Sequence, residues 1–84
     1  NVKSSVISNG CLIEGMVENS IIGRGCEIRK GAVVRNCVVN ADVVIGKDVH
    51  VENMVIDKHA KLIHSNQIIA ETEKPGYIRR GDKL

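Results

Sequence analysis

Branched aliphatic residues recur along the chain in a phrase that appears three times with the same spacing. Val17, Val34 and Val51 open the phrases VENSII, VRNCVV and VENMVI, and the interval between them is constant (34 − 17 = 17 and 51 − 34 = 17). A weaker copy, VKSSVI, begins at Val2. Repetition at a fixed period indicates a solenoid, in which each unit buries its apolar face only by stacking on its neighbours.

Each repeat divides into three parts. From Val34 the aliphatic positions run to Val39, Ile45 and Val51, so the successive steps are five, six and six. A step of six does not return a side chain to the same face of a helix, and Val, Ile, Gly and Asn favour strands and turns. The pattern therefore predicts triangular coils of three short strands, stacked as parallel sheets over roughly four coils, with the first residue of each side pointing inward.

A second residue on each side, four positions after the first, is small or apolar. Counting forward in this way predicts that Ile21 and Val38 point inward, and that Cys37 is exposed near a corner. The complete second set is Val6, Cys11, Ile21, Cys26, Ala32, Val38, Val43, Val49, Val55, Ala60 and Asn66.

Corners of such coils need residues that tolerate positive φ or tight turns. The aligned Asn19, Asn36 and Asn53 meet this need, and we expect their amides to form a ladder along the axis. Six glycines are further corner candidates: Gly10, Gly15, Gly23, Gly25, Gly31 and Gly46.

The repeat pattern stops after Ile69. The following residues, ETEKPG at 71–76, break the strand pattern, and one short apolar segment at 77–78 precedes a charged end. We therefore predict a β-helix over residues 1–69 and a terminal cap or tail over residues 70–84 that covers the last coil.

The hexads IGRGCE, IRKGAV and IGKDVH, which begin at Ile22, Ile28 and Ile45, carry an aliphatic residue first and a small or apolar residue fifth. This pattern resembles the hexapeptide-repeat proteins, over about residues 2–68. The resemblance implies an all-β fold, a left-handed parallel β-helix.

Composition narrows the possible functions. The net charge is +2 and Tyr77 is the one aromatic residue, so a nucleic-acid partner is not expected. No apolar run is long enough to span a membrane, and no signal peptide is recognisable, so we expect no membrane partner. The three cysteines are too few for a disulfide framework. We expect Cys11 and Cys26 to share an interior column as reduced thiols, which fits a cytoplasmic protein.

Candidate chemistry is sparse. His50, His59 and His64 raise the possibility of zinc, but they occupy different repeat positions, so surface histidines are the preferred interpretation. No catalytic, cofactor-binding or metal-binding residue is predicted within the chain. The basic residues Arg24, Arg29, Lys30 and Arg35 are either a solvated face or a site for an anionic effector at an interface.

The phrases VENSIIGRGC, KGAVVRNCVV and NMVIDK look most like glucose-1-phosphate adenylyltransferases, and the end of the repeats is similar to the GlgD-type glycogen biosynthesis subunit. The resemblance implies a parent that uses ATP with Mg²⁺, whose N-terminal nucleotidyltransferase domain is absent from this chain. It also implies contacts with that domain and with other adenylyltransferase subunits, homo- or hetero-oligomeric. The catalytic subunit type and a mannose-1-phosphate guanylyltransferase remain alternatives. A small trimeric hexapeptide acyltransferase or carbonic-anhydrase-like protein is the rival function.

Overall fold

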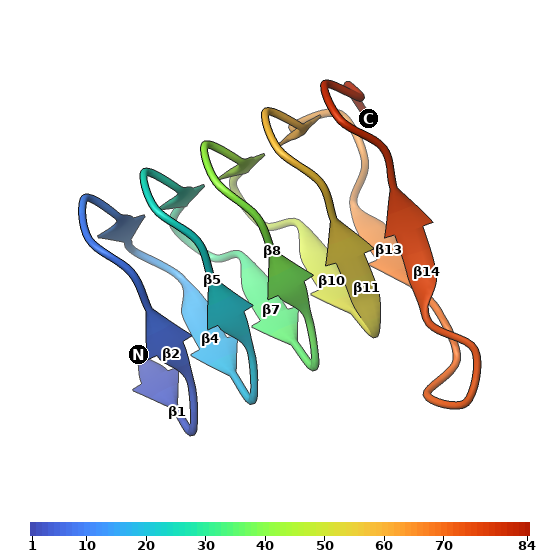
Figure 1. Cartoon of the computed structure of the whole chain (residues 1–84), viewed down its shortest axis with the longest axis horizontal. Coiled ribbons are helices and arrows are strands. Elements are labelled where there is room, and N and C mark those ends of the chain that lie inside the picture. Colours follow the sequence, from blue (N-terminus) through green and yellow to red (C-terminus); the bar gives the residue numbers. More distant parts are fainter.

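A computed structural model describes residues 1–84 as an all-β solenoid of stacked triangular coils (Figure 1). Three parallel sheets form the sides of the prism, and each of the first four coils contributes one short strand to each sheet. No helix is present, so no helical segment of the structure could cross a membrane. The predicted parallel β-helix of triangular coils is confirmed.

Sheet A begins each coil. Its order is β1-β4-β7-β10-β13. The strands are β1 (Val2–Lys3), β4 (Met16–Glu18), β7 (Val33–Arg35), β10 (His50–Glu52) and β13 (Gln67–Ile69).

Sheets B and C complete the triangle. Sheet B contains β2 (Val6–Ile7), β5 (Ile21–Ile22), β8 (Val38–Val39), β11 (Met54–Ile56) and β14 (Gly76–Ile78). Sheet C contains β3 (Leu12–Ile13), β6 (Glu27–Ile28), β9 (Val44–Ile45) and β12 (Lys61–Leu62).

The pairing register reproduces the repeat in the sequence. In sheet A, Val17 pairs with Val34, Val34 with Val51, and Val51 with Ile68. Each of these pairs is offset by one complete repeat (34 − 17 = 17), whereas Val2 pairs with Val17 at a smaller offset (17 − 2 = 15) because the first coil is shorter. A constant offset keeps the same side-chain position facing the interior in every coil.

From Val17 to Leu62 the first residue of each side is buried in the interior, as predicted, whereas Val2, in the first coil, is 45% exposed. Eight of these residues have no exposed surface at all: Val17, Ile22, Ile28, Val34, Ile45, Val51, Ile56 and Leu62. They belong to a single apolar cluster of 17 buried residues along the axis. The core is therefore aliphatic, and one column of it runs behind each sheet.

The second interior position differs from the prediction in sheet B. Val6, Ile21 and Val38 are 63%, 53% and 40% exposed, whereas Cys37, expected to be exposed, is only 2% exposed. Asn66, which the same count placed inside the last turn, is exposed as well. Ser20 and Met54, the residues equivalent to Cys37, are also buried. Side chains alternate along a strand, so the small inner residue lies two positions before the next interior aliphatic. On a six-residue side this is the fifth position, but on the five-residue side it is the fourth.

A single residue in the left-handed region turns the chain from sheet A to sheet B. Asn19, Asn36 and Asn53 occupy this corner with φ of 50°, 53° and 58°. The expected glycine corners divide into two groups: Gly10, Gly25 and Gly31 have positive φ, and Gly15, Gly23 and Gly46 do not. A β-carbon at Gly15 would lie 2.5 Å from the carbonyl oxygen of Ala32, so close backbone approach explains that second group.

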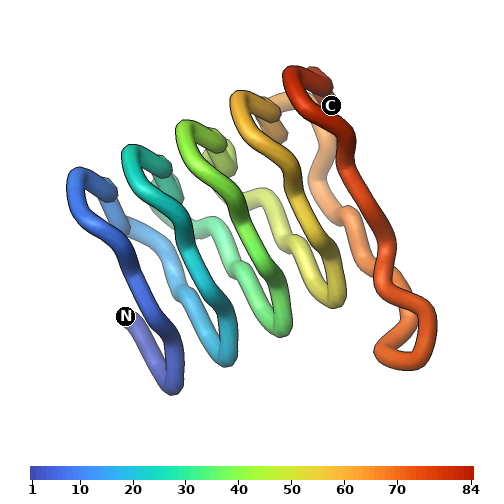
Figure 2. Tube along the Cα trace, in the orientation of Figure 1, coloured from blue at the N-terminus to red at the C-terminus, as the bar shows by residue number.

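The C-terminal tail returns to the solenoid after a protruding loop, which Figure 2 shows at the end of the prism away from the N-terminus. β14 pairs with β11, and Lys83 bridges to Lys61 of β12. The tail thus covers the fourth coil as two further sides of a fifth one. The step from Ile68 to Ile78 is longer than in any other coil (78 − 68 = 10), because the loop at 70–75 bulges from the corner between sheets A and B.

Candidate interaction surface

The outer face of sheet B presents an apolar row along the whole prism. Its members, one from each coil, are Val6, Ile21, Val38, Val55 and Tyr77. Val6, Ile21 and Val38 are 63%, 53% and 40% exposed, and Tyr77 is 58% exposed. The five-residue spacing of this side creates the row, because the strand residue next to the interior aliphatic must face outward. We call these five residues the sheet B row.

The outer faces of the other two sheets carry charge. Outward positions of sheet A include Lys3, Glu18, Arg35 and Glu52, stacked in register. Outward positions of sheet C include Glu27 and Lys61 alongside Leu12 and Val44. The sheet B row is therefore the one outer row of the prism that has an apolar side chain in every coil.

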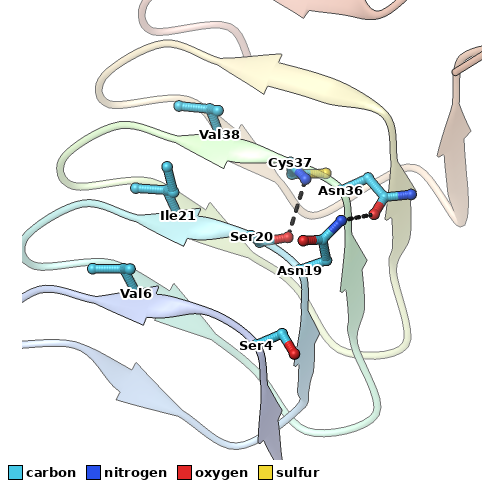
Figure 3. A pocket seen from close by; sticks show the side chains of 8 residues that line it. All are labelled: Ser4, Val6, Asn19, Ser20, Ile21, Asn36, Cys37 and Val38. Atoms are coloured by element: carbon cyan, nitrogen blue, oxygen red, sulfur yellow. Dashed lines mark hydrogen bonds between the residues drawn. The ribbon is translucent and has the colours of Figure 1, made fainter. Parts of the chain in front are cut away.

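A shallow groove of about 320 Å³ runs beside the row at the corner between sheets A and B. Figure 3 shows Val6, Ile21 and Val38 stacked one above another on one side of it, and Asn19 and Asn36 on the other. The complete lining is Ser4, Val6, Asn19, Ser20, Ile21, Asn36, Cys37 and Val38. No ionisable carboxylate, imidazole or amine lines the groove, so its chemistry is that of neutral hydrogen bonds and apolar contact.

The predicted asparagine ladder is confirmed along this corner. Nδ2 of Asn19 donates to Oδ1 of Asn36 at 2.7 Å, and Nδ2 of Asn36 donates to Oδ1 of Asn53 at 3.2 Å. Nδ2 of Asn53 then donates to the carbonyl oxygen of Ala70 at 2.8 Å. Because that carbonyl can only accept, it fixes the direction of the whole column of amides.

Serine hydroxyls satisfy backbone groups just inside the same corner. The backbone N–H of Ser20 donates to Oγ of Ser5, and that of Cys37 donates to Oγ of Ser20, both at 3.0 Å. Oγ of Ser20 in turn donates to the carbonyl oxygen of Glu18. These bonds hold neighbouring coils together where the ladder hydrogen bonds of the sheets are interrupted, and so they make the groove wall rigid.

The four basic residues proposed for an anionic effector lie at three different places. Arg24 is at the corner between sheets B and C, Arg29 and Lys30 are at the corner between sheets C and A, and Arg35 ends β7. Arg29 pairs with Glu27 at 3.3 Å. The effector site remains a prediction.

Arg35 is part of a charged column on sheet A. Its Nε lies 2.9 Å from Oε1 of Glu18, and its Nη1 lies 3.8 Å from Oε1 of Glu52. The two carboxylates neutralise the guanidinium from the coils on either side. An added anion at this point would have to compete with both.

The three histidines lie apart. His50 is in β10, His59 turns the corner between sheets B and C, and His64 follows sheet C. No group of three or more His, Cys, Asp or Glu side chains converges where a metal ion could bind. Nε2 of His50 is buried without a hydrogen-bond partner, 3.4 Å from Oε2 of Glu52, so the contact becomes an ion pair only when the imidazole is protonated.

The cysteines are free thiols in the coil interior. Cys26 and Cys37 are buried, and Cys11, in the first coil, is partly exposed. Burial raises the pKa of both the Cys26 and the Cys37 thiols, since the thiolate would lose its hydration. Each thiol instead donates to a backbone carbonyl oxygen, that of Asn40 for Cys26 and that of Arg35 for Cys37. These two cysteines are structural rather than reactive groups.

Sequence reasoning missed the sheet B row because it counted the inner position forward from the start of each side. The signal that identifies the row is the doublet Ile21–Ile22, repeated as Val38–Val39 and Val55–Ile56. In a strand only one member of such a doublet can face the core. A second aliphatic in every coil therefore indicates an outer apolar row.

Comparisons with known proteins agree with the geometry. The sequence profile of the family described as "GlmU-like, C-terminal hexapeptide" matches residues 1–76. A protein named glycogen biosynthesis protein GlgD from Bacillus subtilis is 35% identical over 80 residues, which are 95% of this chain and 23% of that protein. A glucose-1-phosphate adenylyltransferase from Fervidobacterium nodosum is 48% identical over 56 residues, which are 67% of this chain and 14% of that protein.

A third relative, the GlgD protein of Geobacillus stearothermophilus, is 65% identical over 34 residues, 40% of this chain and 10% of that protein. The chain thus spans less than a quarter of the length of these relatives. No solved structure matches the chain significantly.

Proposed function

The chain belongs to the GlmU-like, C-terminal hexapeptide family, and we propose that it serves as a non-catalytic oligomerisation and regulatory domain of a glucose-1-phosphate adenylyltransferase subunit in glycogen biosynthesis. The observation that carries this proposal is the match to a GlgD protein over 95% of the chain but only 23% of that protein. A match that covers nearly the whole chain but only a small part of the relative is typical of one domain within a larger polypeptide.

The construction of the coils supports a role in assembly rather than in chemistry. The interior is an apolar cluster of packed side chains, and the groove is lined by neutral groups without an acid–base pair. The prominent external feature is an exposed apolar row, which is typical of a protein–protein contact.

The proposal assigns the chemistry of the parent to its other domain. ATP, glucose 1-phosphate and Mg²⁺ would be handled there, and the β-helix would contact that domain and neighbouring adenylyltransferase subunits. The basic residues Arg24, Arg29, Lys30 and Arg35 stay candidates for an effector contact. A cytoplasmic location fits three cysteines that are all free thiols, two of them buried.

The reading frame that encodes the chain provides the first test. We expect it to encode a nucleotidyltransferase domain upstream of these coils. The second test compares the full-length protein with a version that lacks these coils, by light scattering and by ADP-glucose formation from ATP and glucose 1-phosphate with Mg²⁺. We expect the truncated protein to be a smaller assembly. A frame without that domain, or a purified chain that binds zinc or transfers acyl groups, would refute the proposal.

A further inference from the structure

The sheet B row is uncharged, and four of its five residues are exposed, while Val55 is half-buried. It is bordered at one corner by Ser4, Asn19 and Asn36, and at the other by Ser8, Gly23 and Asn40. Over the first three coils no charged residue lies in the row or in these two borders. Depletion of charge around a central apolar strip is the composition of an interface core.

The row also exposes apolar surface that is continuous from coil to coil. Ile21, in the middle of the groove, is 53% exposed although its neighbour Ile22 is completely buried. The equivalent positions in the coils above and below are the aliphatic residues Val6 and Val38, so the exposed surface is continuous along the axis. A continuous strip gains more from one partner surface than separate exposed residues could gain.

We propose that the sheet B row is the contact surface for a second copy of this chain, which packs on it face to face about a two-fold axis. This inference rests on the oligomerisation role proposed above and names the surface and the partner. A two-fold arrangement is favoured because only one side of the prism is apolar in every coil. A ring needs two different complementary surfaces on each subunit, whereas a two-fold dimer uses the same surface twice.

Charge distribution supports the same arrangement. Charged residues on sheet A, such as Glu18, Arg35 and Glu52, already form ion pairs with one another within the chain. The opposing of two uncharged rows leaves these charged residues outside the contact, and the charged border residues Asp57 and Arg79 of the fourth and fifth coils lie toward one end of it. A partner with a strongly charged surface would gain nothing from the row.

The available area is enough for a specific but weak contact. A face of five coils about 4.8 Å apart and about 18 Å wide has an area of roughly 450 Å² per copy. Because side chains make the surface uneven, the accessible area buried by the pair would be about 1,000 Å². These dimensions agree with the overall extents of 28 × 25 × 20 Å. Such an area is at the lower limit of specific interfaces, so we expect a dissociation constant in the micromolar range for the chain alone.

In this arrangement the long axes of the two prisms run in opposite directions, so the middle coil of one copy lies against the middle coil of the other. Val38 is the third of the five residues in the row, and thus lies nearest the two-fold axis. Val6, in the first coil, then faces Tyr77, in the fifth coil, of the second copy. This register makes the arrangement testable residue by residue.

The test is sedimentation of the full 84-residue chain and its Ile21→Glu variant across low to high micromolar concentrations. Leu12→Glu is the matched control, because Leu12 is also an outward strand residue and is 50% exposed, but on sheet C. We expect dimers that Ile21→Glu weakens by about a hundredfold or more and that Leu12→Glu leaves intact. Circular dichroism of each variant verifies that the coils remain folded.

Cysteine cross-linking tests the register in the same chain. Under mild oxidation, Val38→Cys should link two copies and Leu12→Cys should not; Val6→Cys should link to Tyr77→Cys but not to itself. A folded chain that is monomeric at every concentration, or that dimerises equally with Glu at position 21, would overturn the proposal. Cross-links from sheet A or C, or capture only of an upstream domain on this row, would also overturn it. None of these outcomes alters the reading-frame and ADP-glucose tests, so the two proposals can fail separately.

Discussion

Two adjacent isoleucines provide the sharpest test of which side chains hold the coils together. Ile22 is completely buried and Ile21 is 53% exposed, although both belong to the two-residue strand β5. Replacing each with alanine removes the same three carbon atoms from opposite faces of one sheet. Helix or turn propensity plays no part in the difference, because the backbone environment is shared.

The expected loss in the free energy of unfolding for each variant follows from the packing around the replaced side chain. Ile22 lies between Ile7 and Val39 of the adjacent coils, and hydrogen-bonded coils cannot close around the void that Ile22→Ala would leave. We therefore expect a loss of about 3–4 kcal/mol in the free energy of unfolding, within the range for buried aliphatic truncations. Ile21 buries about half its surface, so Ile21→Ala should cost about 1 kcal/mol or less.

Urea denaturation followed by circular dichroism measures both values. The protein concentration must stay in the low micromolar range, because self-association through Ile21 would add a concentration-dependent contribution to stability. Equal losses for the two variants, or a larger loss for Ile21→Ala, would show that the assignment of inner and outer faces in sheet B is wrong. Losses below about 1 kcal/mol for both would show that the coils are not close-packed.

Three further outcomes are expected. Asn36→Ala should lower the free energy of unfolding by about 2–3 kcal/mol, because it removes two ladder hydrogen bonds and puts alanine at a φ of 53°. Asn36→Gly should cost about 1 kcal/mol less, because glycine adopts this φ without strain. An equal cost for the two variants would contradict the role of backbone strain. Because the pKa values of Cys26 and Cys37 are raised in the folded chain, the stability they contribute is complete below the ordinary thiol pKa of about 8.5 and decreases as the pH rises above it. A urea series from pH 7 to 10 measures this, and stability that increased with pH would contradict it. The Tyr77 hydroxyl donates to Asp57 at 2.6 Å and lowers the pKa of that carboxyl, so Tyr77→Phe should raise it toward the ordinary value in an NMR titration, and an unchanged pKa would contradict the contact.

Features that depend only on the repeat could be predicted from the sequence. The register of Val17, Val34 and Val51 follows from a constant spacing, because parallel coils bring equivalent positions together. The ladder of Asn19 and Asn36 follows for the same reason, since equal spacing puts one amide above another. Neither inference required knowledge of side-chain packing.

Features that depend on the conformation of a corner could not be predicted from the repeat spacing. Cys37 was predicted to be exposed, yet it is buried, because one asparagine in the left-handed region turns this corner and shortens the side by a residue. The tail is a second example. Pro75 and the charged residues before it indicate a break, but the strand Gly76–Ile78 rejoins sheet B beyond that break. Sequence patterns locate an interruption and do not reveal whether the chain returns.

The constant offset between paired coils limits how such a domain can change in length over evolution. Insertion or deletion of one whole coil preserves all three sheets and the asparagine column, since every remaining residue keeps an equivalent neighbour. Loss or gain of a residue within a strand would instead turn aliphatic side chains outward. A corner tolerates more, since the first coil is two residues shorter than the next (17 − 15 = 2) and its strands still pair in register. The long step from Ile68 to Ile78 shows the other permitted route, because its extra residues leave the prism at a corner. Relatives should therefore differ by complete coils or by changes at corners, and rarely by changes within the strands.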